Sequence, residues 1–226
     1  MNKKHLVVLT GAGISAESGL KTFRDNDGLW MGHNIEDVAT PRGFAKNPSL
    51  VLDFYNQRRA EVKLAKPNAA HTALAQLQKK YKVTIVTQNI DDLHERGGSI
   101  KVVHLHGEIF KMRSVNNTQK IYNIDGDINL GDLDEDGTQL RPHIVWFEEE
   151  VPMIEKAAIV MQNADIFLLV GTSLQVYPAA GLIDFVPAEV PKYIVDKVIP
   201  AVSQYKNIIP IQGTATEGLA KILNFL

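Results

Sequence analysis

Short runs of consecutive apolar residues recur along the chain, and the stretches between them carry apolar residues three or four positions apart. The apolar runs are Leu6–Thr10, Val83–Thr87, Val102–Leu105, Ile166–Val170 and Tyr193–Asp196. Runs that are apolar at nearly every position are typical of strands covered on both faces of a parallel sheet. The stretches with helical spacing are Ala69–Tyr81, Met153–Ala164 and Thr216–Leu226. This alternation predicts an α/β fold with a Rossmann-like, doubly wound parallel sheet.

The stretch 111–140 interrupts the alternation, because it is mostly polar and its second half is acidic. We therefore interpret residues 1–226 as a single domain with a small inserted subdomain at 111–140. The acidic run 132–137 matches the opening of an EF-hand loop, but His143 stands where such a loop needs its bidentate glutamate. We predict no calcium site.

Composition removes several classes of function. The 226 residues carry 24 Lys and Arg against 26 Asp and Glu, a net charge of −2, so the chain has no basic footprint for nucleic acid. The absence of cysteine excludes disulfides, thiolate metal sites and cysteine nucleophiles. The apolar run near the N-terminus is too short for a secretory leader, and no run is long enough to cross a membrane. We expect a cytoplasmic protein without a nucleic-acid or membrane partner.

The first strand ends in a glycine-rich turn, Gly11-Ala12-Gly13-Ile14-Ser15, which leads toward an expected helix. Glycines allow the backbone to approach a pyrophosphate closely, and a helix N-terminus then stabilises its charge. Ala16 stands at the third position of the dinucleotide fingerprint, where alanine is an accepted variant. A tight strand-to-helix turn also needs glycine for structural reasons alone, so both interpretations stay open at this point.

Polar residues follow three further strands of the expected sheet, where open α/β sheets bind their ligands. They are Gln88-Asn89-Ile90-Asp91, His104-Leu105-His106-Gly107 and Gly171-Thr172-Ser173. Strand alternation places His104 and His106 on one face, where a histidine can act as general base. The first two clusters also have a structural interpretation, since Asp91 or Asp92 can cap the helix that begins near Leu93 and a lone histidine is more often a packed residue. Arg24 is either a cation beside the phosphates or an exposed surface residue.

Taken together, these motifs resemble the signature of the sirtuins, the NAD-dependent protein deacylases. The matching segments occur in the family's order: 11–19, Phe23-Arg24, Gly28-Leu29-Trp30, Gln88–Asp91, Leu105-His106-Gly107, Arg141-Pro142, Val145-Trp146-Phe147 and Gly171-Thr172-Ser173. The resemblance covers nearly the whole chain, and several ordered motifs are far more specific than any one of them alone.

The resemblance implies a role for each of these positions. The NAD site would comprise Gly11, Ala12, Gly13, Ser15, Phe23, Arg24, Trp30, Gln88, Asn89, Ile90, Asp91, Gly171, Thr172, Ser173, Asp196 and Ala215. Asn89 and Asp91 would organise the nicotinamide end of this site, and His106 would be the general base. In sirtuins the acyl-lysine carbonyl oxygen attacks the ribose carbon as nicotinamide leaves, and the products are nicotinamide, O-acyl-ADP-ribose and free lysine. The segment Val145-Trp146-Phe147 resembles the strand that pairs with the backbone of the acyl-lysine protein or peptide.

The resemblance also indicates which acyl group is removed. Tyr55 and Arg58 resemble the Tyr-x-x-Arg pair of the desuccinylase and demalonylase subgroup, and Ala39 resembles the small residue that widens their acyl pocket. Positions 55 and 58 share a face of a helix, so a phenol and a guanidinium can converge on one carboxylate. An amphipathic helix with a packed Tyr55 and a solvated Arg58 is the structural alternative. We expect residues 32–68 to form a helical insertion that shapes this pocket.

Most sirtuins hold a structural zinc ion with four cysteines, in the segment that corresponds to 111–140. That segment contains no cysteine here, and the histidines of the chain lack the paired spacing of a zinc site. We therefore expect no bound metal, and a small subdomain in place of the zinc module.

Two other functions fit the same motifs. A sirtuin-like domain can act as an NAD hydrolase or ADP-ribosyltransferase, against which the peptide-pairing segment and the Tyr55/Arg58 pair argue. It can also be a non-catalytic sensor of NAD or ADP-ribose, against which the presence of His106, Asn89 and Asp91 argues.

Overall fold

A six-stranded parallel sheet forms the larger part of the molecule, whose computed structural model describes residues 3–21, 29–30 and 32–226. The strand order is β11-β10-β9-β1-β4-β5. The strands are β1 (His5–Thr10), β4 (Lys82–Thr87), β5 (Val102–His104), β9 (Ile166–Val170), β10 (Lys192–Asp196) and β11 (Ile208–Gln212). The predicted fold class is confirmed, but the apolar runs predict only the first five of these strands. At the edge of the sheet, β11 is partly exposed and contains Pro210, so it lacks the continuous apolar pattern.

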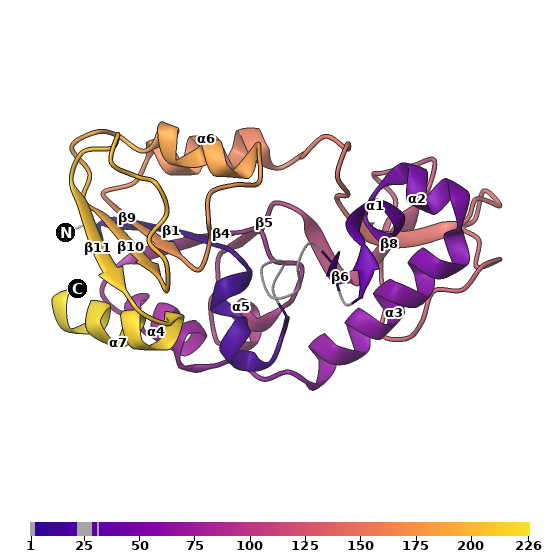
Figure 1. Ribbon diagram of the computed structural model, residues 1–226, viewed down its shortest axis with the longest axis horizontal. Coiled ribbons are helices and arrows are strands. Elements are labelled where there is room, and N and C mark those ends of the chain that lie inside the picture. Colours follow the sequence, from indigo (N-terminus) through magenta and orange to yellow (C-terminus); the bar gives the residue numbers. More distant parts are fainter. Residues whose placement is uncertain (1–2, 22–28, 31) are drawn as a thin grey trace.

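Helices cover both faces of this sheet (Figure 1). On one face α4 (Ala69–Leu77) packs against α7 (Ala215–Phe225), and on the other face α6 (Ile154–Gln162) packs beside the 3₁₀ segment Ala179–Phe185. Alternate side chains of β1 enter these two layers, so every residue of the strand is buried. The three predicted helices are confirmed, although α4 ends in a turn four residues before Tyr81. Within the described residues, none of the helices combines the length and the apolar character needed to cross a bilayer.

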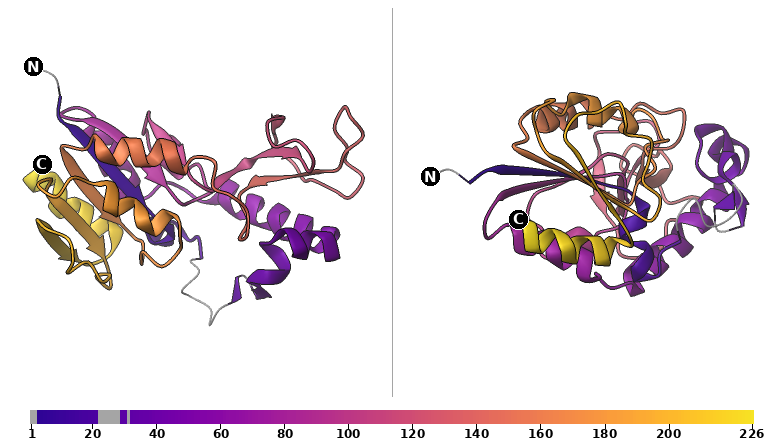
Figure 2. Two further views of the ribbon diagram at one scale, coloured as in Figure 1. Left: turned by 90° about the horizontal axis from the view of Figure 1, so that it is seen from above. Right: turned by 60° about the vertical axis from the view of Figure 1, so that its left-hand side comes forward.

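Two groups of helices and strands form a smaller part of the molecule beside the six-stranded sheet (Figure 2). Two short strands, β2 (Leu29–Trp30) and β3 (His33–Asn34), precede the helices α1 (Ile35–Val38), α2 (Pro41–Lys46) and α3 (Pro48–Leu64). A three-stranded antiparallel sheet in the order β7-β6-β8 consists of β6 (Gly107–Ser114), β7 (Ile121–Asn123) and β8 (Leu140–Ile144). The short helix α5 (Leu93–Arg96) links β4 to β5. The polar stretch 111–140 thus contains β7 and most of the loops of this small sheet.

Polar side chains of α3 hold the loop that precedes β8. The amide of Asn56 donates to the carbonyl oxygen of Ile128 and accepts from its N–H, both at 3.0 Å, so it takes the place of a neighbouring strand. Arg59 donates to the carbonyl oxygen of Gly126 at 3.2 Å. A small buried cluster lies beside these bonds, made of Leu52, Ile128 and Leu140. In the described part of the chain, no three His, Asp or Glu side chains are grouped so as to hold a metal ion, and the expected absence of zinc stays a prediction.

Replacing Asn56 by leucine is expected to lower the free energy of unfolding by about 2–4 kcal/mol, because the buried N–H and C=O of Ile128 both lose their partner. Asp53→Asn, on the exposed side of α3, is the matched control and should change it by less than about 0.5 kcal/mol. Urea titration measures the free energy of unfolding of both variants.

EDTA should leave the urea unfolding curve of the wild type unchanged, because we expect no structural metal. A clear loss of stability with EDTA would contradict this expectation.

Two buried histidines pack edge to face between α4 and α5. The ring centroids of His71 and His94 lie 5.1 Å apart. The hydroxyl of Thr10 donates to Thr87, so Nε2 of His94, 3.0 Å from that hydroxyl oxygen, is the donor in its bond to Thr10. Burial lowers the pKa of His71 to about 4 and lowers the pKa of His94 well below its usual value. Both rings are therefore neutral in the folded protein near neutral pH.

The stability of the protein is expected to decrease on mild acidification. Below about pH 6.5 the unfolded chain binds protons at positions 71 and 94 that the folded chain does not bind. The stabilisation is complete above that pH and is lost as the pH falls toward 4, by up to about 1.4 kcal/mol per pH unit for each histidine. Urea unfolding between about pH 7 and about pH 5 measures the slope. His71→Gln should reduce the dependence of the unfolding free energy on pH. An unaltered slope in that variant would show that His71 does not contribute to the pH dependence.

Candidate active site

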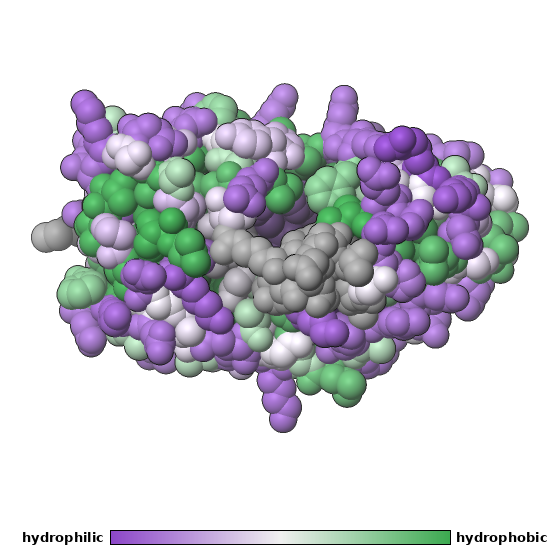
Figure 3. All heavy atoms as spheres, in the orientation of Figure 1, coloured by the Kyte–Doolittle hydropathy of each residue, from purple (hydrophilic) through white to green (hydrophobic). Residues whose placement is uncertain are grey.

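The carboxyl ends of the central strands open into one cavity of about 340 Å³, a volume typical of small-molecule and cofactor sites. The space-filling view shows a hollow between the larger and the smaller part of the molecule (Figure 3). The cavity is lined by these predicted cofactor residues: Gly11, Ala12, Gly13, Ser15, Gln88, Asn89, Ile90, Asp91, Gly171, Thr172, Ser173, Asp196 and Ala215. Phe23, Arg24 and the side chain of Trp30 lie outside the described residues.

The glycine-rich turn does not lead into an α-helix. It forms two 3₁₀ turns, Ala12–Ile14 and Ala16–Ser18, and the left-handed backbone of Gly19 ends the second one. A Cβ atom on Gly13 would lie 2.7 Å from Cα of Gly171. The predicted helix N-terminus at the pyrophosphate is therefore wrong, and the glycines are needed because two strand-end turns approach each other closely. The structural interpretation of these glycines is correct, and the same residues line the cavity.

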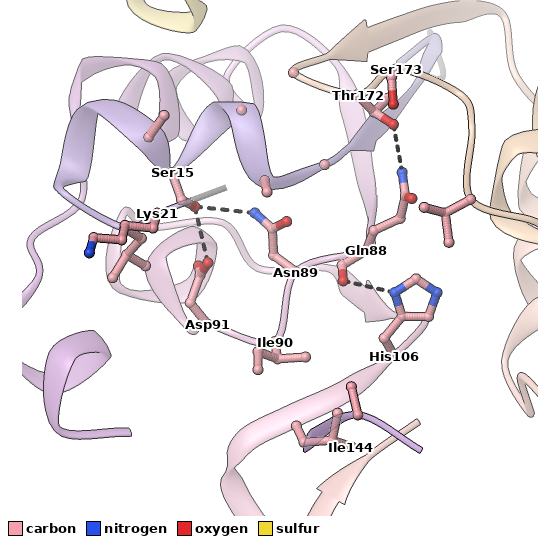
Figure 4. A pocket seen from close by; sticks show the side chains of 18 of the residues that line it. Ser15, Lys21, Gln88, Asn89, Ile90, Asp91, His106, Ile144, Thr172 and Ser173 are labelled. Atoms are coloured by element: carbon pink, nitrogen blue, oxygen red, sulfur yellow. Dashed lines mark hydrogen bonds between the residues drawn. The ribbon is translucent and has the colours of Figure 1, made fainter. Parts of the chain in front are cut away.

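Asn89 and Asp91 follow β4, and both contact the hydroxyl of Ser15 (Figure 4). Nδ2 of Asn89 donates to Oγ of Ser15 at 3.1 Å, and that hydroxyl donates to Oδ2 of Asp91 at 3.0 Å. The other oxygen of Asp91 accepts the N–H of Leu93, the first residue of α5, at 3.1 Å, although the N-cap position itself is Asp92. Burial raises the pKa of Asp91, against the effect of these hydrogen bonds. Asp91 thus begins the turn into α5 and lines the cavity at the same time.

Hydrogen bonds of side chains also join the ends of neighbouring strands. The backbone N–H of Asn89 donates to the hydroxyl oxygen of Thr87 at 3.0 Å, which also accepts the hydroxyl of Thr10. Nε2 of Gln88 donates to the hydroxyl oxygen of Thr172 at 3.0 Å, as Figure 4 shows. Thr10 and Thr87 therefore connect the ends of β1 and β4, and Gln88 and Thr172 connect those of β4 and β9.

His106 lines the cavity with one ring nitrogen engaged. Its Nδ1 lies 3.0 Å from the carbonyl oxygen of Gln88 (Figure 4) and must carry the proton, which makes Nε2 the basic nitrogen of the neutral ring. Burial lowers the pKa of His106, although the bond to Gln88 acts in the opposite direction. The backbone of Gly107 has a φ of 82°, and a Cβ atom there would lie 2.0 Å from the carbonyl oxygen of His143. Only glycine allows this turn directly after His106.

Of the two histidines that strand alternation places on one face, His106 lines the cavity and His104 does not. β5 ends at His104, and the chain turns before His106. Nε2 of His104 lies 2.9 Å from Oε1 of Glu95. Burial opposes a charge on His104, but the hydrogen bond and the charge of Glu95 raise its pKa. His104 is a packed, paired residue outside the cavity lining.

Tyr55 and Arg58 of α3 line the same cavity as His106, together with Ala39 after α1. Both long side chains are buried, with exposed fractions of 0% for Tyr55 and 7% for Arg58, so the alternative with a solvated Arg58 is wrong. Nη1 of Arg58 contacts Oε2 of Glu61 at 3.2 Å, and Nη2 donates to the carbonyl oxygen of Lys21 at 3.3 Å. Burial raises the pKa of Tyr55, which keeps its hydroxyl a neutral donor. Leu20, Val62 and Ile144 supply apolar lining that the sequence alone does not single out.

The segment Val145–Phe147 is not a strand, because β8 ends at Ile144. Its three N–H groups donate within the chain: Val145 to the carbonyl oxygen of His106, Trp146 to the carboxylate of Glu149, and Phe147 to the carbonyl oxygen of Ala39. All three residues line the cavity. A peptide backbone that pairs with this segment would therefore have to donate to its carbonyl oxygens.

The sequence profile of the Sir2 family matches residues 11–178. The chain belongs to the Sir2 family. Two curated relatives named NAD-dependent protein deacylase come from Helicobacter pylori, at 49% identity over 97% of this chain and 96% of that one, and from Bacteroides thetaiotaomicron, at 47% identity over 99% and 98%. A solved Sir2 homolog–NAD complex has a TM-score of 0.88 and 36% identity, covering 99% of this chain and 89% of that one. Sir2 proteins are NAD-dependent enzymes, so the sirtuin resemblance of the sequence is confirmed.

Proposed function

We propose that this Sir2 protein is an NAD-dependent protein-lysine deacylase whose pocket favours acyl chains that end in a carboxylate. The observation that carries the proposal is the continuity of one cavity, which is lined both by Asn89, Asp91 and His106 and by Tyr55 and Arg58. Groups suited to proton transfer and a buried cation suited to an acidic acyl chain therefore face one bound substrate. The deacylase names of its relatives support the same activity.

The residues of the cavity fit NAD. The glycine-rich turns at 11–13 and 171–173 expose backbone to the cavity, as a pyrophosphate and ribose site requires. Asp196, 7% exposed at the end of β10, lines the cavity, and a carboxylate there suits the hydroxyls of a ribose. When bound, NAD supplies the ribose carbon that accepts the acyl oxygen as nicotinamide leaves.

In this proposal His106 is the general base. Its Nδ1–H donates to the carbonyl oxygen of Gln88, which leaves Nε2 to accept a proton from a hydroxyl group in the cavity. Asn89 and Asp91 are oriented through Ser15 and hold the nicotinamide end.

In the same cavity, Arg58 and Tyr55 would bind the carboxylate of a succinyl or malonyl group. Ala39 is 3% exposed, and its small side chain leaves room for a longer acyl chain. Because α3 carries both polar groups, we propose that the segment 32–68 is the insertion that shapes the acyl pocket. We propose likewise that 111–140 is a small subdomain in place of a zinc module, held by α3 through Asn56 and Arg59.

The test is nicotinamide release from NAD in the presence of matched acetyl-lysine, succinyl-lysine and malonyl-lysine peptides, with a peptide-free reaction as control. Release that depends on peptide and is fastest with the acidic acyl groups is expected. Equal rates for all three peptides would leave a general deacylase without acidic preference. Release without peptide would favour the NAD hydrolase, and binding of NAD without release would favour the sensor.

A further inference from the structure

The cation of the proposed acyl pocket already has a carboxylate partner inside the chain. Glu61 lies one helical turn after Arg58 on α3, and its Oε2 is 3.2 Å from Nη1 of the guanidinium. The side chain of Arg58 is 8% exposed and that of Glu61 is 43% exposed. Arg58 lines the cavity and Glu61 does not, so Glu61 approaches the guanidinium from the solvent side.

Among the residues that the structure describes, charges of both signs line the cavity around Arg58. Arg58 and the exposed Lys21 line it on the positive side, and the buried Asp91, whose pKa is raised by burial although Arg58 acts in the opposite direction, lines it on the negative side. Glu61 adds a second negative charge in contact with Arg58. An acyl carboxylate bound by Arg58 would therefore share the guanidinium with Glu61 and be repelled by it, whereas a neutral acetyl group would not.

We propose that Glu61 is a specificity-determining residue that reduces the preference of this enzyme for acidic over neutral acyl chains. The proposal rests on the function proposed for Tyr55 and Arg58, and it concerns the strength of their preference. It follows that the wild-type enzyme prefers acidic over neutral acyl chains less strongly than the same pocket would without Glu61.

Glu61 is not needed to hold Arg58 in place. Nη2 of Arg58 donates to the carbonyl oxygen of Lys21, and the stem of the side chain is buried in the middle of a 17-residue helix. Loss of Glu61 therefore removes a charge while the guanidinium stays at the wall of the cavity.

The experiment compares Glu61→Gln with wild type on matched succinyl-lysine and acetyl-lysine peptides at saturating NAD. The kcat/KM for the succinyl peptide should rise about three- to tenfold, mainly through KM, and that for the acetyl peptide should not change. Because Glu61 is partly exposed, the gain should shrink at high salt. Asp53→Asn removes the same charge from an exposed position of the same helix and should leave both values unchanged.

The outcomes separate this proposal from the proposed function. A wild type that prefers succinyl, with no gain or a loss in Glu61→Gln, overturns the role of Glu61 and leaves the acidic acyl pocket intact. A wild type without preference, combined with a succinyl preference in Glu61→Gln, supports the role of Glu61 and overturns the acidic preference proposed for the natural enzyme. If neither protein prefers the succinyl peptide, the proposal of an acidic acyl pocket is wrong, and so is the role proposed for Glu61.

Discussion

Replacing His106 by asparagine is expected to reduce kcat for deacylation by about 10²–10⁴, the usual contribution of a general base. Asparagine matches the geometry well, because its Nδ2 can keep the hydrogen bond that Nδ1 of His106 donates to the carbonyl oxygen of Gln88. It has no basic nitrogen in the position of Nε2. Affinity for NAD and the melting temperature should therefore change little. Nicotinamide release, calorimetric titration with NAD and thermal unfolding measure the three quantities.

The natural control for this variant is His104→Asn. Nδ1 of His104 also bonds a backbone carbonyl oxygen at a strand end, that of Asn89, but the ring lies outside the cavity lining. Its replacement should affect stability more than kcat. Burial lowers the pKa of His106, so the wild-type rate should persist at pH values below the usual range of histidine. A His106→Asn enzyme with wild-type kcat, or an equal loss in both variants, would exclude His106 as the base.

The elements that could be predicted from the sequence are those whose environment is uniform along their length. β1 is buried at all six positions between two helical layers, and its four central residues, Leu6–Leu9, form a continuous apolar run. β11 is an edge strand that pairs with β10 alone, so exposed and buried residues mix within it and no apolar run marks it. The predicted helices are similarly clear, because each buries one face against the sheet.

Contacts between distant segments could not be predicted. Whether Gly13 serves a cofactor or a tight turn depends on Gly171, which approaches it from the end of another strand. The different surroundings of His104 and His106 could not be predicted, because β5 ends at His104 and strand periodicity does not apply beyond it. The N–H groups of Val145 and Phe147 bond to the carbonyl oxygens of His106 and Ala39, which are far away in the sequence, and no local pattern predicts these bonds.

More of the candidate site than of these contacts could be predicted from the sequence, because the polar residues of the site directly follow strands. Gln88–Asp91 and Gly171–Ser173 lie where an open parallel sheet binds ligands, and the structure brings them to one cavity. Glu61 carries no such signal, because a charged residue at an exposed helix position is ordinary. Its contact with Arg58 becomes significant only once Arg58 is known to be buried.

Arg58→Met should lower kcat/KM for a succinyl-lysine peptide by about 10–150-fold, since a hydrogen bond to a charged group contributes about 1.5–3 kcal/mol. Methionine keeps the length and apolar stem of the side chain, so the acetyl peptide should react at nearly the wild-type rate. Arg59→Met is the matched control. Arg59 is a buried cation at the next position, but it bonds the carbonyl oxygens of Ile109 and Gly126 and does not line the cavity. The Arg59→Met variant should lose stability and keep the wild-type ratio of succinyl to acetyl rates. If Arg58→Met also keeps the wild-type ratio, Tyr55 and Arg58 do not bind the acyl carboxylate and only pack in the protein.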